Sequence, residues 1–195
     1  MSPRPPGRPR SSTARRSIIK ATLSLVNERG YGAATMEEIA RRAGVSKQTV
    51  YRWWPSPAAI VLEAINEGAS RAAPLPDSGD FDADLREFIR RSVDGAQRSG
   101  RLLTALMSEA QRNPDFAMSF RTEFLAHRRN ILYELLDRAR RRGAIRQDAD
   151  LALAVEIFFG TLWYRLLADA GPVDSRFADS LTGALLALIT PRQSP

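Results

Sequence analysis

Residues 35–54 read TMEEIARRAGVSKQTVYRWW, two short helical patterns separated by Gly44. A glycine at this point can adopt the left-handed backbone conformation that other residues resist. The small Ala40 allows two helices to cross closely, and Val50 can bury against the first of them. This spacing predicts a helix-turn-helix, although glycine turns also occur in many other helical hairpins.

Both helices of this stretch carry a start signal. Thr35 and Glu38 have the spacing of a capping box, in which the hydroxyl accepts from an amide and the carboxylate reaches back. Ser46 can cap the second helix. These signals predict helices that begin at Thr35 and at Ser46.

The outward face of the second helix is suited to DNA. Val45, Val50 and Trp54 are expected to face inward. The polar residues of the opposite face are Lys47, Gln48, Thr49, Tyr51 and Arg52. Lysine can reach guanine, glutamine can pair with adenine, and hydroxyl groups can hold phosphates. An ordinary surface helix would also be polar, but it would rarely lack every acidic residue between Ala40 and Glu63, as this segment does.

The positive charge of the chain is concentrated at one end. Residues 1–60 contain 11 Lys or Arg against three Glu, whereas residues 61–195 contain 18 Arg against 19 Asp or Glu. The whole chain carries a net charge of +7. A genome rich in GC would explain the preference for arginine but not its position, so we expect a polyanion to bind the N-terminal part.

The remaining sequence predicts an all-α fold of about nine helices, because no stretch alternates with a period of two. The first helix is expected over 12–29 and the fourth over 56–72, before a linker at 73–79. Later helices are expected from Asp80, over 101–111 and 114–142, and after caps at Asp148 and Asp174. The predicted domains are a disordered basic arm (1–11), a helix-turn-helix domain (12–56), and a ligand-binding and dimerisation domain (57–195) that helix four joins to the first.

Residues 31–56, YGAATMEEIARRAGVSKQTVYRWWPS, resemble the DNA-binding domain of the TetR family of bacterial transcriptional regulators. The resemblance is close over 12–65. It implies that Lys47, Gln48 and Tyr51 approach bases. It also implies phosphate contacts from Thr35, Thr49, Tyr51 and Arg52, and Ser46 completes the predicted DNA-binding set. One position departs from the family, since Pro57 stands where a phosphate-binding lysine is usual.

The basic N-terminus suggests a further DNA contact. Residues 6–10, PGRPR, resemble the core of arms that enter the minor groove, where narrow A/T-rich DNA attracts arginine. This predicts contacts from Arg8 and Arg10. The alternative is a disordered tail that contributes only diffuse charge, and the sequence leaves both open.

The C-terminal region is expected to form a homodimer through helices eight and nine. Residues 158–167, FFGTLWYRLL, resemble the eighth helix of family members, which pairs with its dimer mate. The region contains more apolar residues than a solvated surface helix would: Leu151, Leu153, Val155, Ile157, Phe158, Leu162, Leu166, Leu181, Leu185, Leu188 and Ile189. A helix buried centrally in a monomer is the alternative. A palindromic DNA operator needs two recognition helices, which favours the dimer.

The same region is expected to bind a small apolar effector of unknown identity. The predicted pocket residues are Phe88, Met107, Phe120, Phe124, His127 and Trp163. Such aromatic stripes are more often simple core. His127 is the only histidine in the chain, and we expect it to be partly buried; it is also the best polar candidate on the stripe.

Other functional classes find little support in the sequence. There is no cysteine and only one histidine, so no metal site and no cofactor are expected. The apolar stretches are shorter than a membrane span, and no secretory signal is present, which predicts a cytoplasmic protein. An all-helical enzyme and a nucleoid-type protein that binds DNA without sequence preference are the alternatives to a repressor, and activators share this DNA-binding head.

Overall fold

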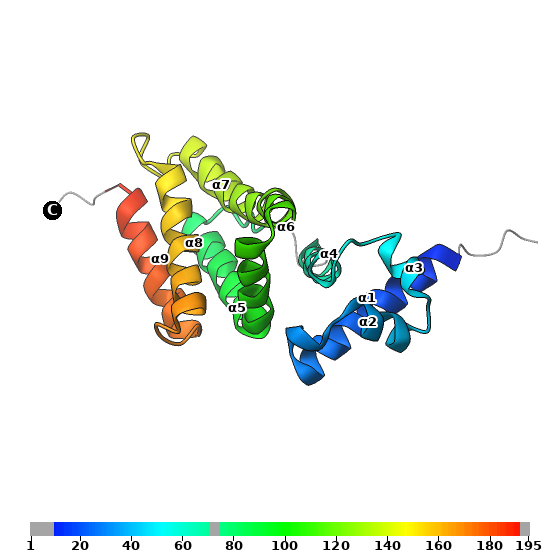
Figure 1. The fold of residues 1–195 in the computed structure, drawn as a ribbon. Coiled ribbons are helices and arrows are strands. Elements are labelled where there is room, and N and C mark those ends of the chain that lie inside the picture. Colours follow the sequence, from blue (N-terminus) through cyan, green and yellow to red (C-terminus); the bar gives the residue numbers. More distant parts are fainter. Residues whose placement is uncertain (1–9, 71–74, 192–195) are drawn as a thin grey trace, which may run out of the picture. The chain divides into compact units, whose positions relative to one another are not determined.

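A computed structural model describes residues 10–70 and 75–191. Within these residues the chain is helical and contains no strand, which confirms the all-α prediction (Figure 1). The chain folds into two compact units. Unit 1 comprises residues 1–72 and 108–117, and unit 2 comprises residues 73–107 and 118–195.

Unit 1 contains the predicted helix-turn-helix. Its helices are α1 (Arg10–Arg29), the 3-10 turn η1 (Tyr31–Ala33), α2 (Met36–Ala43), α3 (Lys47–Tyr51) and α4 (Pro57–Ser70). Helix α1 packs against both α2 and α4, and α2 packs against α3. The fully buried side chains that hold them together are Ile18, Leu25, Ile39, Val50 and Ile60. Each contributes on the order of 1.5–3 kcal/mol through burial, so the short α3 is stable because of its neighbours.

The later helices are α5 (Phe81–Arg112), α6 (Pro114–Ser119), the π-helical turn η2 (Phe120–Leu125), α7 (Ala126–Arg141), α8 (Leu151–Ala168) and α9 (Ser175–Ile189). Helix α8 packs against α7 and α9 in unit 2 (Figure 1). The largest fully buried side chains of unit 2 are Leu85, Ile89, Leu106, Phe120, Leu132, Leu135, Leu136 and Phe158. They form the apolar core of unit 2.

One predicted helix boundary in the later part of the chain is wrong. The expected break before Arg101 does not occur, because α5 continues through Gly95 and Gly100. A Cβ atom at Gly100 would lie 3.3 Å from Leu166 Cδ2, so the glycine leaves room for the Leu166 side chain of α8. The long helix expected over 114–142 is helical from Pro114 to Arg141 without a break, and its residues Phe120–Leu125 form the π-helical turn η2.

The capping box at the start of α2 forms only in part. The Thr35 hydroxyl accepts from the Glu38 amide at 3.2 Å, as predicted. The Glu38 carboxylate does not reach back, since it accepts from the Arg41 guanidinium at 2.6 Å. The Thr35 amide donates instead to the Ala33 carbonyl at 3.0 Å.

Of the two predicted N-caps of the last two helices, one is confirmed and one is wrong. Asp174 caps α9 by accepting from the Phe177 amide at 2.9 Å. Helix α8 is capped by Asp150 and not by Asp148, because the Leu153 amide donates to Asp150 Oδ1 at 2.9 Å.

Helix α8 is the one described helix with the length and apolarity of a membrane span, with a mean hydropathy of 1.5 over 18 residues. Its inward face, Leu151, Ala154, Val155, Phe158 and Leu162, is buried in unit 2. Core helices of globular proteins commonly meet the same criteria, and Glu156 and Arg165 interrupt the apolar run.

Candidate nucleic-acid interface

The turn between α2 and α3 depends on Gly44. This residue has φ 68° and ψ 33°, the left-handed conformation predicted for it. Its amide donates to the carbonyls of Ala40 and Arg41, and the Val45 amide donates to Ala40 at 3.1 Å. These bonds end α2 and turn the chain directly into α3.

The start of α3 is fixed by Ser46. The Thr49 amide donates to the Ser46 hydroxyl at 3.2 Å, which confirms the predicted cap. The two hydroxyls of Ser46 and Thr49 also share a hydrogen bond of 2.9 Å. The side chain of Thr49 is therefore engaged within the protein, and it is half-buried.

The inner face of α3 is anchored by two apolar residues. Val50 is fully buried, and Trp54, shortly after the helix, is almost fully buried. The Trp54 indole Nε1 donates to Glu63 Oε2 of α4 at 2.9 Å. Glu63 also forms an ion pair with Arg15 of α1. The end of α3 is thus tied to both neighbouring helices.

The outer face of α3 is exposed. Lys47, Gln48 and Arg52 face solvent, and Tyr51 is 52% exposed. The Arg52 guanidinium lies 5.5 Å from the ring centroid of Trp53, a cation–π contact. Lys47, Gln48, Tyr51 and Arg52 face outward as expected from the sequence, whereas Thr49, expected on the same face, is half-buried.

Lys47 has a partner that the sequence reasoning missed. Its ammonium forms an ion pair with the Glu37 carboxylate of α2. The hydrogen bond within this pair lowers the pKa of Glu37 and raises the pKa of Lys47. The only signal in the sequence was an acidic residue in the first turn of α2, where the helix dipole alone accounts for it.

The other predicted DNA-binding residues lie in different places. Thr35 is exposed at the start of α2, in the same helix-turn-helix. Arg8 lies outside the described residues. Arg10 is the first residue of α1, so the helix begins inside the segment that was expected to be a disordered arm.

The family departure at Pro57 places proline at the first position of α4. Ser56 caps this helix, and the Ala59 amide donates to its hydroxyl at 3.3 Å. Pro57 has no amide hydrogen, and the Ala59 amide is already engaged. The start of α4 therefore offers fewer free donors to a phosphate than a usual helix N-terminus.

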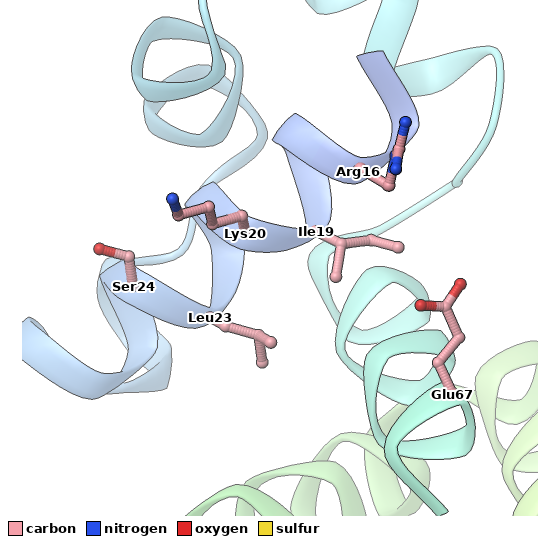
Figure 2. A pocket seen from close by; sticks show the side chains of 6 residues that line it. All are labelled: Arg16, Ile19, Lys20, Leu23, Ser24 and Glu67. Carbon is pink, nitrogen blue, oxygen red and sulfur yellow. The ribbon is translucent and has the colours of Figure 1, made fainter. Parts of the chain in front are cut away.

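A pocket of about 380 Å³ lies between α1 and α4 in unit 1 (Figure 2). Its lining residues are Arg16, Ile19, Lys20, Leu23, Ser24 and Glu67. Two apolar side chains of α1 thus lie between charged groups. None of the residues predicted to bind an effector belongs to this pocket.

The predicted effector residues come together only in part, in unit 2. Phe120 stacks on Phe124 with ring centroids 5.4 Å apart, and it meets the edge of Trp163 at 6.4 Å. The remaining candidates lie elsewhere in unit 2: Phe88 packs on Phe158 at 5.9 Å, Met107 is half-buried, and His127 is exposed. The expectation that His127 is partly buried is wrong, because its position on α7 faces solvent.

Known proteins resemble this chain along most of its length. The uncharacterized HTH-type transcriptional regulator YdeS of Bacillus subtilis is 29% identical over 179 residues, 90% of this chain and 89% of the relative. The crystal structure of the TetR family transcription regulator SCO0332 has a TM-score of 0.76 and 36% identity, and the match covers 91% of this chain and 99% of that one. FadR of Thermus thermophilus, a TetR family repressor solved in complex with lauroyl-CoA, has a TM-score of 0.66 at 24% identity, with coverage of 93% and 97%. This last likeness concerns the fold alone.

Two family models match separate parts of the chain. Residues 18–64 match the model described as bacterial regulatory proteins, tetR family. Residues 75–185, more than half of the chain, match the model described as tetracyclin repressor-like, C-terminal domain. Together with the exposed outer face of α3, these matches show that the chain belongs to the TetR family of ligand-responsive, DNA-binding transcriptional regulators.

Proposed function

We propose that this regulator is a cytoplasmic repressor that binds a palindromic operator as a homodimer and is released by a small effector with an apolar body. The observation that carries the proposal is the two-sided character of α3. Val50 and Trp54 lock its inner face, while Lys47, Gln48 and Tyr51 lie exposed on the outer face. A helix whose inner face is fixed by packing and whose outer face is polar can enter a major groove with little loss of conformational entropy.

Each outer side chain has a suitable DNA partner. Lys47 can reach guanine O6 and N7, Gln48 can pair with adenine, and Tyr51 can contact a base or a phosphate. The phosphate contacts proposed beside them come from Thr35, Thr49 and Arg52, with Ser46 fixing the start of the helix. A protein without sequence preference would not need this ordered set of base-reading groups, and the family membership gives no support to an enzyme.

The proposed dimer uses the outer faces of α8 and α9. Leu153 of α8 is 46% exposed and Leu188 of α9 is 39% exposed. Tyr164 and Leu167 add to the exposed apolar surface of α8. The inner faces of both helices are already buried in unit 2, so a second protomer is a suitable cover for the outer faces. Two protomers would present their α3 helices to half-sites about 34 Å apart.

The proposed release mechanism acts through α4. Trp54, shortly after α3, is hydrogen-bonded to Glu63 of α4. A movement of α4 would therefore displace the end of α3 and change the spacing of the two recognition helices. We place the effector among the aromatic residues of unit 2, Phe120, Phe124 and Trp163 together with Phe88 and Met107. FadR of T. thermophilus, which has the same fold, was solved with lauroyl-CoA.

Binding to the promoter region of its own gene tests the proposal. Fluorescence anisotropy should give an affinity orders of magnitude higher for this DNA than for a random duplex of equal length. Tyr51→Ala should weaken specific binding at least about tenfold and leave the fold intact, since the side chain is exposed. Tyr133→Ala removes an exposed tyrosine of α7 and is the matched control. Equal affinity of wild type for both duplexes, or an unaffected Tyr51 variant, would contradict the proposal.

A further inference from the structure

Arg128 of α7 is a half-buried cation to which the described part of the chain supplies no carboxylate. Its guanidinium lies 5.7 Å from the ring centroid of Phe124. Burial lowers the pKa of Arg128, and no charged neighbour contributes to that shift. A buried charge is normally paired, because water no longer stabilises it. The free protein therefore holds a cation whose natural complement is an anion from outside.

The other half-buried arginines of residues 75–191 are all satisfied within the chain. Each contacts a carboxylate or a backbone carbonyl: Arg91 with Glu87, Arg129 with Glu156, Arg138 with Asp77, Arg140 with Asp137, Arg146 with Asp148, and Arg165 with the Pro172 carbonyl. The protein thus pairs its half-buried arginines as a rule. Arg128 is the exception among the described residues.

The surroundings of Arg128 are aromatic. Phe124 stacks on Phe120, which in turn meets the edge of Trp163. Phe120 and Phe124 belong to the π-helical turn η2, a feature that is frequent at functional sites. A cation at one end of an apolar aromatic cluster is complementary to a molecule with an acidic head and an apolar body.

We propose that Arg128 binds the acidic head group of the effector, so that the effector is an amphipathic oxyanion, a carboxylate or a phosphate attached to an apolar chain or ring. This proposal rests on the proposed effector site in unit 2. It replaces the neighbouring His127, which is exposed, as the polar contact of that site. Arginine suits this role because its planar donors match both carboxylate and phosphate oxygens.

The test compares three ligands that share one chain and differ in the head group. Dodecanoate, dodecyl phosphate and dodecanol are titrated against the full-length protein by isothermal calorimetry. At least one of the two anions should bind wild type about tenfold or more tightly than the alcohol, as expected for a charge-assisted hydrogen bond; which anion binds better identifies the head group. Arg128→Gln should remove this preference. Arg129→Gln, an equal change at the adjacent residue, should keep it.

A second readout needs no ligand. If Arg128 is retained for binding, Arg128→Met removes a half-buried charge that has no carboxylate partner, and the midpoint of thermal unfolding should stay equal or rise. A clear fall would show a structural role and would overturn the proposal. The absence of any preference for an anion in wild type would overturn it as well.

Operator binding separates this inference from the proposed function. The Arg128→Gln variant without ligand should bind the operator as wild type does. Anion binding that leaves the operator complex intact would support the Arg128 site and contradict effector-driven release. Operator binding that responds only to dodecanol would support release and overturn the role of Arg128.

Discussion

The Glu37 carboxylate of α2 holds the Lys47 ammonium of α3 in an ion pair across the helix-turn-helix. Both side chains are more than half exposed, so the pair contributes little to stability. Its effect is on DNA binding. The ion pair with Glu37 must break before the Lys47 ammonium can contact a base or a phosphate. The Glu37 carboxylate also repels phosphates that approach α3.

Glu37→Gln should therefore increase affinity for random DNA several-fold and reduce discrimination in favour of the operator. The plot of log affinity against log salt concentration should become steeper by up to about one unit, because one more cation neutralises phosphate. Anisotropy titrations at several salt concentrations measure both effects. Glu28→Gln is the control, since Glu28 of α1 forms its ion pair with Arg42 of α2 and not with a residue of α3. If both variants changed DNA affinity and salt dependence equally, the cause would be the change in net charge and not the release of Lys47.

Gly44→Ala tests the left-handed turn. An added Cβ at Gly44 meets no atom within 4 Å, so the cost is the backbone conformation alone. We expect a loss of about 1–2 kcal/mol in the free energy of unfolding, measured by urea titration. Gly32→Ala is the control, because Gly32 also has open space around it and does not have positive φ. A comparable loss at Gly32 would show that the turn geometry is not the cause.

Trp54→Phe tests the link between α3 and α4. The change removes the Nε1 donor and leaves the part-buried Glu63 carboxylate without that hydrogen bond. The expected destabilisation is about 1–3 kcal/mol. Trp53→Phe, at the adjacent and exposed tryptophan, should stay within about 0.5 kcal/mol. If the proposed release mechanism is right, effector addition should also change operator affinity less in the Trp54 variant than in wild type.

The helix-turn-helix could be predicted from sequence because its signals are local. The caps at Thr35 and Ser46 and the turn at Gly44 involve residues within four positions of one another. The continuity of α5 could not be predicted in this way, because it depends on residues that are distant in the sequence. A glycine costs a helix only about 1 kcal/mol, and a Cβ at Gly100 would lie 3.3 Å from Leu166 Cδ2, so a larger residue there would require Leu166 to shift.

The same contrast separates the two candidate sites. The outer face of α3 follows from helical periodicity, because Val50 marks the inward side. Neither the Glu37 partner of Lys47 nor the unpaired state of Arg128 has a periodic signal, since both depend on how side chains from different turns meet. The π-helical turn η2 likewise has no sequence signature, and it displaces Phe124 and Arg128 from the register that a regular helix would give them.

Leu153→Asp combined with Leu188→Asp tests the proposed dimer. The two side chains lie on the exposed faces of α8 and α9, so the buried core of unit 2 should remain intact. Sedimentation velocity should show wild type as a dimer and the double variant as a monomer, since buried unpaired carboxylates strongly oppose association. Operator affinity should fall when the dimer is lost, because one protomer reaches only one half-site.

The control is Met118→Asp, which removes an apolar side chain of similar size to leucine. Met118 is 62% exposed on α6, and the variant should remain a dimer. A double variant that still sediments as a dimer would assign the interface to other helices, whereas a monomer that keeps full operator affinity would contradict the need for two recognition helices.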